Sequence, residues 1–206
     1  MTEYREPEYA AAYLAKQDTI PQRGVGERLL LDFLPAQTGR VLDLGCGDGR
    51  LFALVRSRFP ATAGVLLDHS PAMLDAARER DWGAEKPRFV AHDLTQPLPD
   101  LGKFDAVVSG FAIHHLPDKR KRELYTELRG LLLPGGVLLN LEHVASSSED
   151  EHGRFLALLG GAEDASNRLA PAWEQVQWLV QSGFCRADVV WKWLELALIV
   201  GWTETD

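Results

Sequence analysis

The residues best suited to hold a ligand lie in the stretch 41–50, which reads VLDLGCGDGR. Three glycines at alternate positions, Gly45, Gly47 and Gly49, suit a backbone that turns sharply and passes close to a ligand, because glycine takes positive φ without steric cost. Asp43 stands two residues before the first of them. A carboxylate there would repel a pyrophosphate and attract an ammonium group. We therefore expect this loop to face a ligand with a positive charge.

Two familiar phosphate-binding loops do not fit this stretch. Arg50 stands where G-x-G-x-x-G needs its third glycine, and the lysine loop G-x-x-x-x-G-K-[ST] is absent. The first mismatch, together with Asp43, disfavours a nicotinamide dehydrogenase. S-adenosylmethionine fits better, since it carries an α-amino group and a sulfonium but no phosphate. The loop therefore predicts S-adenosylmethionine as cofactor, with S-adenosylhomocysteine as its product.

Alternating strands and helices must position this loop. We expect strands at 40–44, 63–67, 87–91, 104–109 and 137–143, and a hairpin of strands 184–194 and 195–202. We expect helices at 6–17, 22–34, 49–58, 118–131, 151–160 and 171–182, and one more that begins with Ser70 as N-cap and Pro71 at its first position. This alternation predicts a parallel sheet whose ligands bind beyond the carboxyl ends of the strands.

Two further acids follow the second and third predicted strands. Asp68 comes 25 residues after Asp43, where a carboxylate can accept hydrogen bonds from both ribose hydroxyls; capping of the next helix is the alternative. Asp93 can accept from the exocyclic amine of adenine while Leu94 packs on the ring, or it can stabilise a turn. At the end of the fourth strand, Ser109 would line the floor of the site together with Gly110.

These segments together resemble the class I S-adenosylmethionine-dependent methyltransferases of the small-molecule type. The resemblance runs in order through 41–49, 68–74, 92–94, 104–109 and 132–136. It implies an α/β, Rossmann-like seven-stranded sheet, mostly parallel with one antiparallel strand, and helices on both faces. It also implies that Gly45 and Gly47 lie against the methionine portion, that Asp68 and Asp93 bind ribose and adenine, and that His69 belongs to the cofactor site.

We expect residues 1–206 to form a single methyltransferase domain. Its parts would be N-terminal lid helices at 1–36, the cofactor-binding core at 37–143, and substrate-side helices with a C-terminal β-hairpin at 144–206. Tyr4, Tyr9, Tyr13 and Arg23 lie in the lid. Arg23 could pair with the methionine carboxylate, because a guanidinium binds a carboxylate in bidentate fashion; a solvated surface arginine is the alternative.

The catalytic residues are not assigned by these motifs. Methyl transfer from a sulfonium is an in-line displacement, and a base is needed only if the nucleophile is protonated. His114 and His115 after the fourth strand could accept a proton or simply form a turn. Glu142 and His143 at the end of the fifth strand could face the cleft or belong to a buried hydrogen-bonding network. No metal is expected, since the histidines and acids at 143–152 match no ligand spacing.

The composition of the chain limits the partners and the location that we expect for it. The net charge of −8 disfavours general nucleic-acid binding, and the basic run 119–122 is interpreted as a solvated helix face. Cys46 and Cys185 suggest no disulfide framework. The N-terminus lacks the layout of a signal peptide, and no apolar run approaches the roughly 20 residues of a membrane helix. We therefore expect a cytoplasmic protein without membrane contact.

The sequence thus predicts transfer of a methyl group from S-adenosylmethionine to an unidentified small-molecule acceptor. Two alternatives stay open at this point. One is a non-catalytic S-adenosylmethionine-binding partner or sensor protein, since intact binding residues do not prove turnover. The other is an enzyme that modifies the cofactor itself, which would need an extra positive residue near the methyl group. The attacking atom of the acceptor and the oligomeric state are left open by the motifs.

Overall fold

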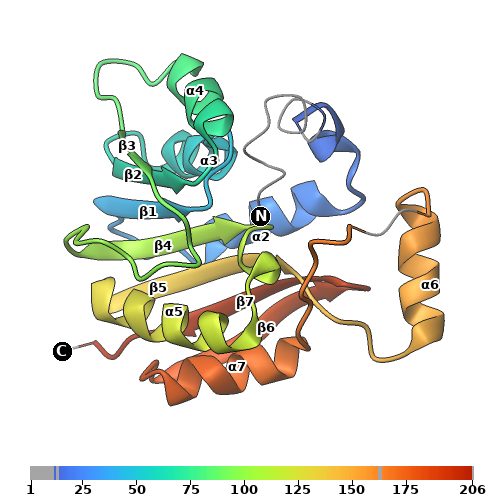
Figure 1. The fold of residues 1–206 in the computed structure, drawn as a ribbon. Helices are drawn as coiled ribbons and strands as arrows, with labels where there is room; N and C mark the ends of the chain where they lie inside the picture. Colours follow the sequence, from blue (N-terminus) through green and yellow to red (C-terminus); the bar gives the residue numbers. More distant parts are fainter. Residues whose placement is uncertain (1–11, 13, 162–163, 206) are drawn as a thin grey trace.

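The centre of the molecule is a seven-stranded sheet of order β3-β2-β1-β4-β5-β7-β6 (Figure 1). The computed structural model describes residues 12, 14–161 and 164–205. The strands are β1 (Arg40–Leu44), β2 (Ala63–Asp68), β3 (Arg88–Ala91), β4 (Phe104–Gly110), β5 (Leu132–His143), β6 (Arg186–Trp193) and β7 (Leu196–Trp202). Among these strands β7 alone runs in the opposite direction: it pairs antiparallel with β5 and β6, and the other neighbouring pairs are parallel. The predicted mostly parallel sheet with one antiparallel strand is confirmed.

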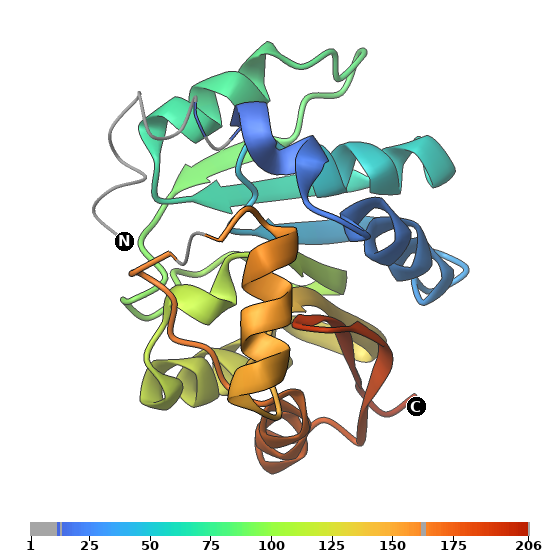
Figure 2. The same cartoon turned by 90° about the vertical axis from the view of Figure 1, so that its right-hand side faces the viewer.

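Helices cover both faces of this sheet (Figure 1). They are α2 (Arg23–Asp32), α3 (Arg50–Arg58), α4 (Pro71–Glu79), α5 (Asp118–Leu131), α6 (Glu149–Leu158) and α7 (Ala172–Gln181), with short 3-10 turns η2 (Gln17–Thr19) and η3 (Ile113–His115). Helices α2, α3 and α4 pack on one face, and α5 and α7 pack on the other. Figure 2 looks toward the right-hand end of Figure 1 and shows α6 standing in front of the sheet.

The central strands are buried on both faces because their side chains are apolar almost throughout. Val41 enters the core beneath α2 and α3, while its neighbour Leu42 enters the core beneath α5. The parallel register sets Leu44 of β1 opposite Leu67 of β2 and Ser109 of β4. The carboxyl ends of these strands therefore meet at one edge of the sheet.

Local signals explain where most elements begin. Ser70 is the N-cap of α4, its hydroxyl accepts from the backbone N–H of Met73, and Pro71 takes the first helical position, as predicted. Helix α6 begins at residue 149 rather than 151, because the Ser148 hydroxyl caps it by accepting from Glu151. Strand β5 begins at Leu132 rather than 137, since Leu132 already pairs with Phe104 before a register shift.

Residues 1–11 and 13 of the expected N-terminal lid, with Tyr4, Tyr9 and Tyr13, lie outside the described residues. Within the described part, residues 12 and 14–16 are helical, and the expected helix 22–34 is α2. Strands β6 and β7 complete the same sheet as β1–β5, and one core cluster includes both Leu42 and Ile199. The domain boundaries at 36 and 143 stay predictions. No described helix has the length and apolar character needed to cross a membrane.

The basic run 119–122 is not a solvated face, and that interpretation is wrong for two of its members. Lys121 is fully buried and Arg120 is only 8% exposed. The guanidinium of Arg120 donates to Glu127 and to the carbonyls of Leu94 and Gln96, at 2.6–2.9 Å. The ammonium of Lys121 donates to Asp118 and to the carbonyl of Arg168. Four consecutive residues cannot share one face of a helix with 3.6 residues per turn, so part of the run turns inward.

The contact between β2 and α3 yields a test of the fold. A Cβ added at Gly64 would lie 2.3 Å from the fully buried ring of Phe52, so Gly64→Ala must displace a packed aromatic side chain. We expect a loss of about 1–3 kcal/mol in the free energy of unfolding, measured by urea denaturation. Gly130→Ala is the matched control: that glycine lies inside α5 with nothing within 4 Å, and we expect a gain of about 0.5–1 kcal/mol. Equal stability of both variants would contradict this packing.

Candidate active site

A cleft opens at the carboxyl ends of β1, β2 and β4. Its walls come from the loops that follow these strands and from the segment leading into α2. The lining residues are Gln17, Arg23, Asp43, Gly45, Cys46, Gly47, Asp48, Arg50, Leu51, Asp68, His69, Met73, Leu94, Gly110, Phe111, Ala112 and His115. Nine of the residues expected at the site from the sequence therefore meet here: Arg23, Asp43, Gly45, Gly47, Asp68, His69, Leu94, Gly110 and His115.

The glycine loop has the backbone that its sequence predicts. Gly45, Gly47 and Gly49 have φ values of +66°, +53° and +78°. A Cβ on Gly45 would lie 2.3 Å from the Cβ of Ala112, so this loop packs directly against the turn after β4. A Cβ on Gly47 would meet nothing closer than the sulfur of Met73 at 4.0 Å. The loop is thus closed against the protein at Gly45 and open toward the cleft at Gly47.

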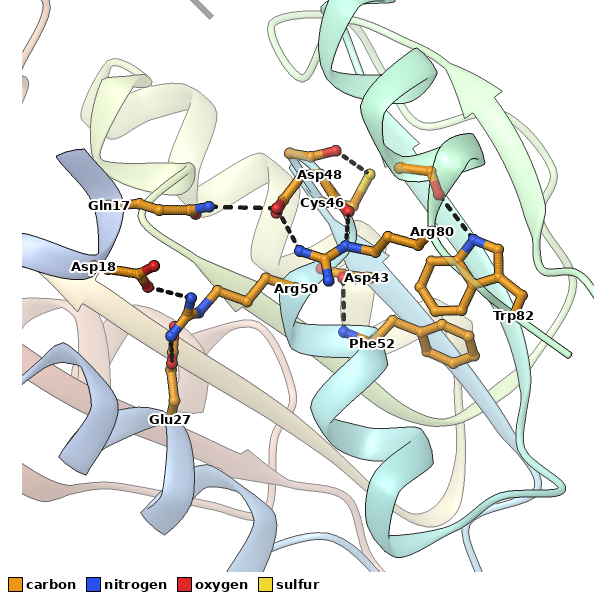
Figure 3. Close-up of polar contacts among 12 residues, drawn as sticks. Gln17, Asp18, Glu27, Asp43, Cys46, Asp48, Arg50, Phe52, Arg80 and Trp82 are labelled. Carbon is orange, nitrogen blue, oxygen red and sulfur yellow. Dashed lines mark hydrogen bonds and ion pairs between the residues drawn. The ribbon is translucent and has the colours of Figure 1, made fainter. Parts of the chain in front are cut away.

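Asp43 carries a carboxylate that the protein only half satisfies (Figure 3). The residue is 1% exposed, and its Oδ2 accepts the backbone N–H of Phe52 at 3.1 Å. Its Oδ1 has no hydrogen-bond partner among the described residues. Burial raises the pKa of Asp43 well above its usual value; the bond from Phe52 works against this shift, and the charges of Asp68 and Asp48 add to it. A cationic hydrogen-bond donor from a ligand would give Oδ1 of Asp43 the partner that it lacks.

Asp68 joins the glycine loop to the start of α4. Its Oδ2 accepts the N–H of Gly47 and its Oδ1 accepts the N–H of Ser70, both at 2.8 Å. The ring nitrogen Nδ1 of His69 lies 3.4 Å from the same carboxylate. A carboxylate offers about four lone-pair positions, so the two backbone bonds leave acceptor capacity on the cleft side. The structural role and the predicted ribose role are therefore compatible.

Two residues of the expected cofactor set lie away from the cleft wall. The Oδ1 of Asp93 accepts from the backbone and hydroxyl of Thr95 at 2.9 and 2.8 Å, which matches the turn alternative. Ser109 is fully buried, because its hydroxyl donates to the carbonyl of Leu44 and so bridges β4 to β1. Neither residue lines the cleft, whereas their neighbours Leu94 and Gly110 do.

An ion-pair group between α2 and α3 was missed by sequence reasoning. Figure 3 shows Arg50 between Glu27 and Asp18. Glu27 is buried, and it also accepts from the Nε of Arg23 at 2.8 Å. The side chain of Arg23 is 6% exposed and its guanidinium lies over the ring of Phe111, 5.0 Å from the centroid. Arg23 is therefore not a solvated surface arginine. The spacing of Arg23 and Glu27, four residues apart on a helix, was the available signal.

Asp48 forms a second polar group on the opposite side of the glycine loop. Its carboxylate accepts from the guanidinium of Arg80 and, at 3.3 Å, from the amide of Gln17 (Figure 3). Gln17 belongs to η2 and lies 31 residues before Asp48. The segment before α2 is thus bonded to the loop after β1. Both residues of this contact line the cleft.

Three of the four candidate catalytic residues belong to a buried network instead of the cleft wall. The Nδ1 of His114 lies 2.6 Å from the Oε1 of Glu142, which also accepts the backbone N–H of His143. Burial would raise the pKa of Glu142, but the charge and hydrogen bond of His114 outweigh burial, and the net shift is downward. His143 bonds to the buried Glu195 at 2.8 Å, as does the ring of His152. No three described His, Cys, Asp or Glu side chains form a group suited to a metal ion.

His115 is the candidate that reaches the cleft. Its ring lies against that of His114, with the centroids 3.9 Å apart and the ring planes inclined by 43°. Burial lowers the pKa of His115 to about 4, and the neighbouring His114 adds to the shift. The imidazole is therefore neutral near pH 7 and presents one donor and one acceptor nitrogen.

Comparison with known proteins defines the class. A family model described as a methyltransferase domain matches residues 41–136. An uncharacterized methyltransferase of Mycobacterium tuberculosis is 36% identical over 148 residues, which cover 72% of each chain. The chain belongs to the class I S-adenosylmethionine-dependent methyltransferases.

One further relative and one solved structure are also similar to this chain. A trans-aconitate 2-methyltransferase of Methylobacterium nodulans is 34% identical over 194 residues, covering 89% of this chain and 70% of the relative. The structure of an O-methyltransferase family protein from Burkholderia thailandensis superposes with a TM-score of 0.75 at 22% identity, covering 97% of this chain and 60% of that one. At that identity the second similarity concerns the fold alone.

The half-satisfied carboxylate predicts an unusual pH dependence of stability. Because its pKa is higher in the folded than in the unfolded chain, folding takes up a proton at Asp43, and this contribution to stability is lost as pH rises above the unfolded value near 4. We expect Asp43→Asn to be more stable than the wild type at pH 8 by at least about 1 kcal/mol, the worth of roughly one pKa unit.

The advantage of Asp43→Asn should shrink as pH falls, and it should vanish below about pH 4, where the wild-type carboxyl becomes protonated in both states. Urea unfolding of the ligand-free proteins across this pH range measures the difference. Asp32→Asn, an exposed aspartate on α2, is the control and should show no comparable trend. An Asp43→Asn variant that is less stable than the wild type at pH 8 would contradict the assignment.

Proposed function

We propose that this cleft binds S-adenosylmethionine and that the protein transfers its methyl group to a small-molecule acceptor. The observation that carries the proposal is the buried Oδ1 of Asp43, which has no partner among the described residues. An unpaired buried carboxylate oxygen is costly, and an ammonium group is the donor that compensates it best. The α-amino group of S-adenosylmethionine supplies such a donor next to a loop built for close approach.

The remaining cofactor contacts follow the order of the strands. The amino-acid end lies over Gly45 and Gly47 at β1, with Arg23 on its carboxylate. The ribose lies at the end of β2, where Asp68 and His69 meet the cleft. The adenine lies toward β3 and packs on Leu94, with Asp93 shaping the turn that presents Leu94 and offering its carboxylate to the exocyclic amine. Ser109 supports the site without contacting the cofactor, because its hydrogen bond to the carbonyl of Leu44 holds β4 against β1.

This arrangement can assist methyl transfer mainly by positioning. When bound, S-adenosylmethionine supplies a methyl group that is already activated by the sulfonium. The chain must hold that methyl group in line with a nucleophile and keep water out, and near-attack geometry accounts for a large part of such rate enhancements. The turn after β4 is packed against Gly45 and so lies next to the proposed amino-acid end. The acceptor then approaches from the side of β4, whose following turn lines the cleft.

The names of the relatives bear on the acceptor only as suggestions. One relative is a trans-aconitate 2-methyltransferase, so small organic acids belong in any acceptor screen. The net charge of −8 argues against nucleic-acid acceptors.

Cofactor binding is tested by calorimetry. We expect both S-adenosylmethionine and S-adenosylhomocysteine to bind, and Asp68→Asn to weaken binding by about 10- to 100-fold, because a hydrogen bond to a charged group contributes about 1.5–3 kcal/mol. Asp32→Asn, on the exposed side of α2, should bind as the wild type does. Since Asp68 also accepts from two backbone amides, the melting temperature of each variant must be recorded. Absence of binding at millimolar cofactor would refute the proposal.

Turnover is tested separately with S-adenosylmethionine labelled at the methyl group. We expect transfer of label to at least one pool among small alcohols, thiols, amines and organic acids, with S-adenosylhomocysteine formed in equal amount. Arg23→Ala should raise the KM for S-adenosylmethionine, since it removes a contact to the proposed carboxylate. Binding without transfer to any pool would favour a non-catalytic partner protein.

A further inference from the structure

We propose that Asp43 exchanges a proton for the α-ammonium group of the cofactor, so that the binding of S-adenosylmethionine releases a proton to solvent. The inference rests on the proposed function, because that function places the amino-acid end of the cofactor beside Asp43. It adds a second ligand for the same oxygen atom, the proton, and it predicts how the affinity for the cofactor depends on pH.

Three aspartates line the cleft, and the protein satisfies two of them. Asp48 accepts from the guanidinium of Arg80 and from the amide of Gln17 (Figure 3). Asp68 accepts one backbone N–H at each of its two oxygens, both at 2.8 Å. Asp43 accepts a single N–H at Oδ2, and its Oδ1 has no hydrogen-bond partner among the described residues. The negative charge that lacks a partner is therefore concentrated on one oxygen atom of the cleft.

The surroundings of Asp43 favour its protonated form when no ligand is bound. The residue is 1% exposed, and an isolated buried carboxylate takes up a proton rather than staying charged. Asp68 of β2 and Asp48 of the glycine loop add negative charge, while the N–H of Phe52 in α3 and the guanidinium of Arg80 after α4 oppose them. Burial is the largest influence, and the pKa of Asp43 lies well above its usual value.

The other ionisable groups nearby do not neutralise this carboxylate. Burial, together with the charge of Asp43, raises the pKa of Cys46 well above its usual value, so the thiol is uncharged. Arg50 donates to Glu27 and to Asp18. Among the described residues no cation donates to Oδ1 of Asp43. The neutralising group must therefore come from solvent or from a ligand.

The proton and the ammonium group compete for the same atom. Because Oδ2 of Asp43 accepts from Phe52 at 3.1 Å, the proton of the carboxyl group lies on Oδ1. An ammonium group has donors only, so it binds best to the ionised form of that oxygen. A carboxyl group that keeps its proton on Oδ1 would direct a hydrogen toward the hydrogens of the ammonium group. The cofactor is therefore expected to displace the proton.

The exchange is balanced without a further reactant. The carboxyl group gives its proton to solvent, and the ammonium group keeps its three protons and donates to the carboxylate. S-adenosylhomocysteine has the same α-amino group and binds with the same release of a proton. Methyl transfer therefore leaves Asp43 ionised, and the proton returns only when the site empties. The pH dependence that Asp43 causes thus belongs to the KM for S-adenosylmethionine and not to kcat.

Calorimetry of the full-length protein measures the proton, in pairs of buffers with different ionisation enthalpies such as phosphate and imidazole. Between about pH 5 and 7, where the free α-amino group is charged, we expect S-adenosylhomocysteine to release up to about one proton. Its association constant should rise with pH by up to about tenfold per unit. 5′-Methylthioadenosine is the matched ligand, because it keeps adenine and ribose but lacks the amino-acid end. It should release no proton.

Asp43→Asn should abolish the release of a proton and make the Kd for S-adenosylhomocysteine independent of pH. Asp32→Asn, an exposed aspartate on α2, should release the proton as the wild type does. Infrared difference spectra give a second measurement: S-adenosylhomocysteine should remove the C=O band of a protonated carboxyl group in the wild type but not in Asp43→Asn.

The outcomes separate this inference from the proposed function. Binding of S-adenosylhomocysteine without a released proton and without loss of the carboxyl band would overturn the inference and leave the proposed function intact. Equal proton release with 5′-methylthioadenosine, or from Asp43→Asn, would also overturn it. If Asp43→Asn binds too weakly to measure, the comparison of the two ligands in the wild type decides. A wild-type protein that does not bind S-adenosylhomocysteine would refute the proposed function itself.

Discussion

The buried carboxylate of Asp43 is the constraint that organises the cleft. This carboxyl group lies on a central strand of the sheet, where it is almost fully removed from water and receives one backbone hydrogen bond. Asp48 and Asp68 add negative charge nearby rather than relieving it. Such a group is tolerated in a folded protein when a ligand or a proton completes it. Asp43 is bonded to the first turns of α3, and the nearby Asp68 is bonded to the glycine loop and to the start of α4.

Elements that depend on local patterns were predictable from the sequence. The bounds of β1 and α5 agree with the prediction residue for residue, and the cap of α4 forms at Ser70 as expected. Buried parallel strands are continuous apolar runs, and caps depend on a few adjacent residues, so both are visible in the sequence. The left-handed glycines of the loop after β1 follow from the same kind of local reasoning.

Contacts between distant segments were not predictable. Glu27 accepts from Arg50, 23 residues further along the chain, and Ser166 contacts His115, 51 residues before it. The sequence around these residues does not indicate which residue the partner is. The expected positions of Asp93 and Ser109 on the cleft wall also required side-chain orientations that only tertiary packing decides. Lys121 is different: its spacing from Leu124, Tyr125 and Leu128 placed it on the apolar stripe of α5, but the neighbouring charges masked this signal.

The two buried cations of α5 have a consequence for how this protein can diversify. Arg120 donates to the carbonyls of Leu94 and Gln96, and Lys121 donates to the carbonyl of Arg168, so the loop after β3 and the segment before α7 are both held through their main chain. A main-chain carbonyl is present whatever side chain a residue carries. Related chains can therefore exchange the side chains of these loops, and with them the shape offered to an acceptor, while the helix keeps the loops in the same place.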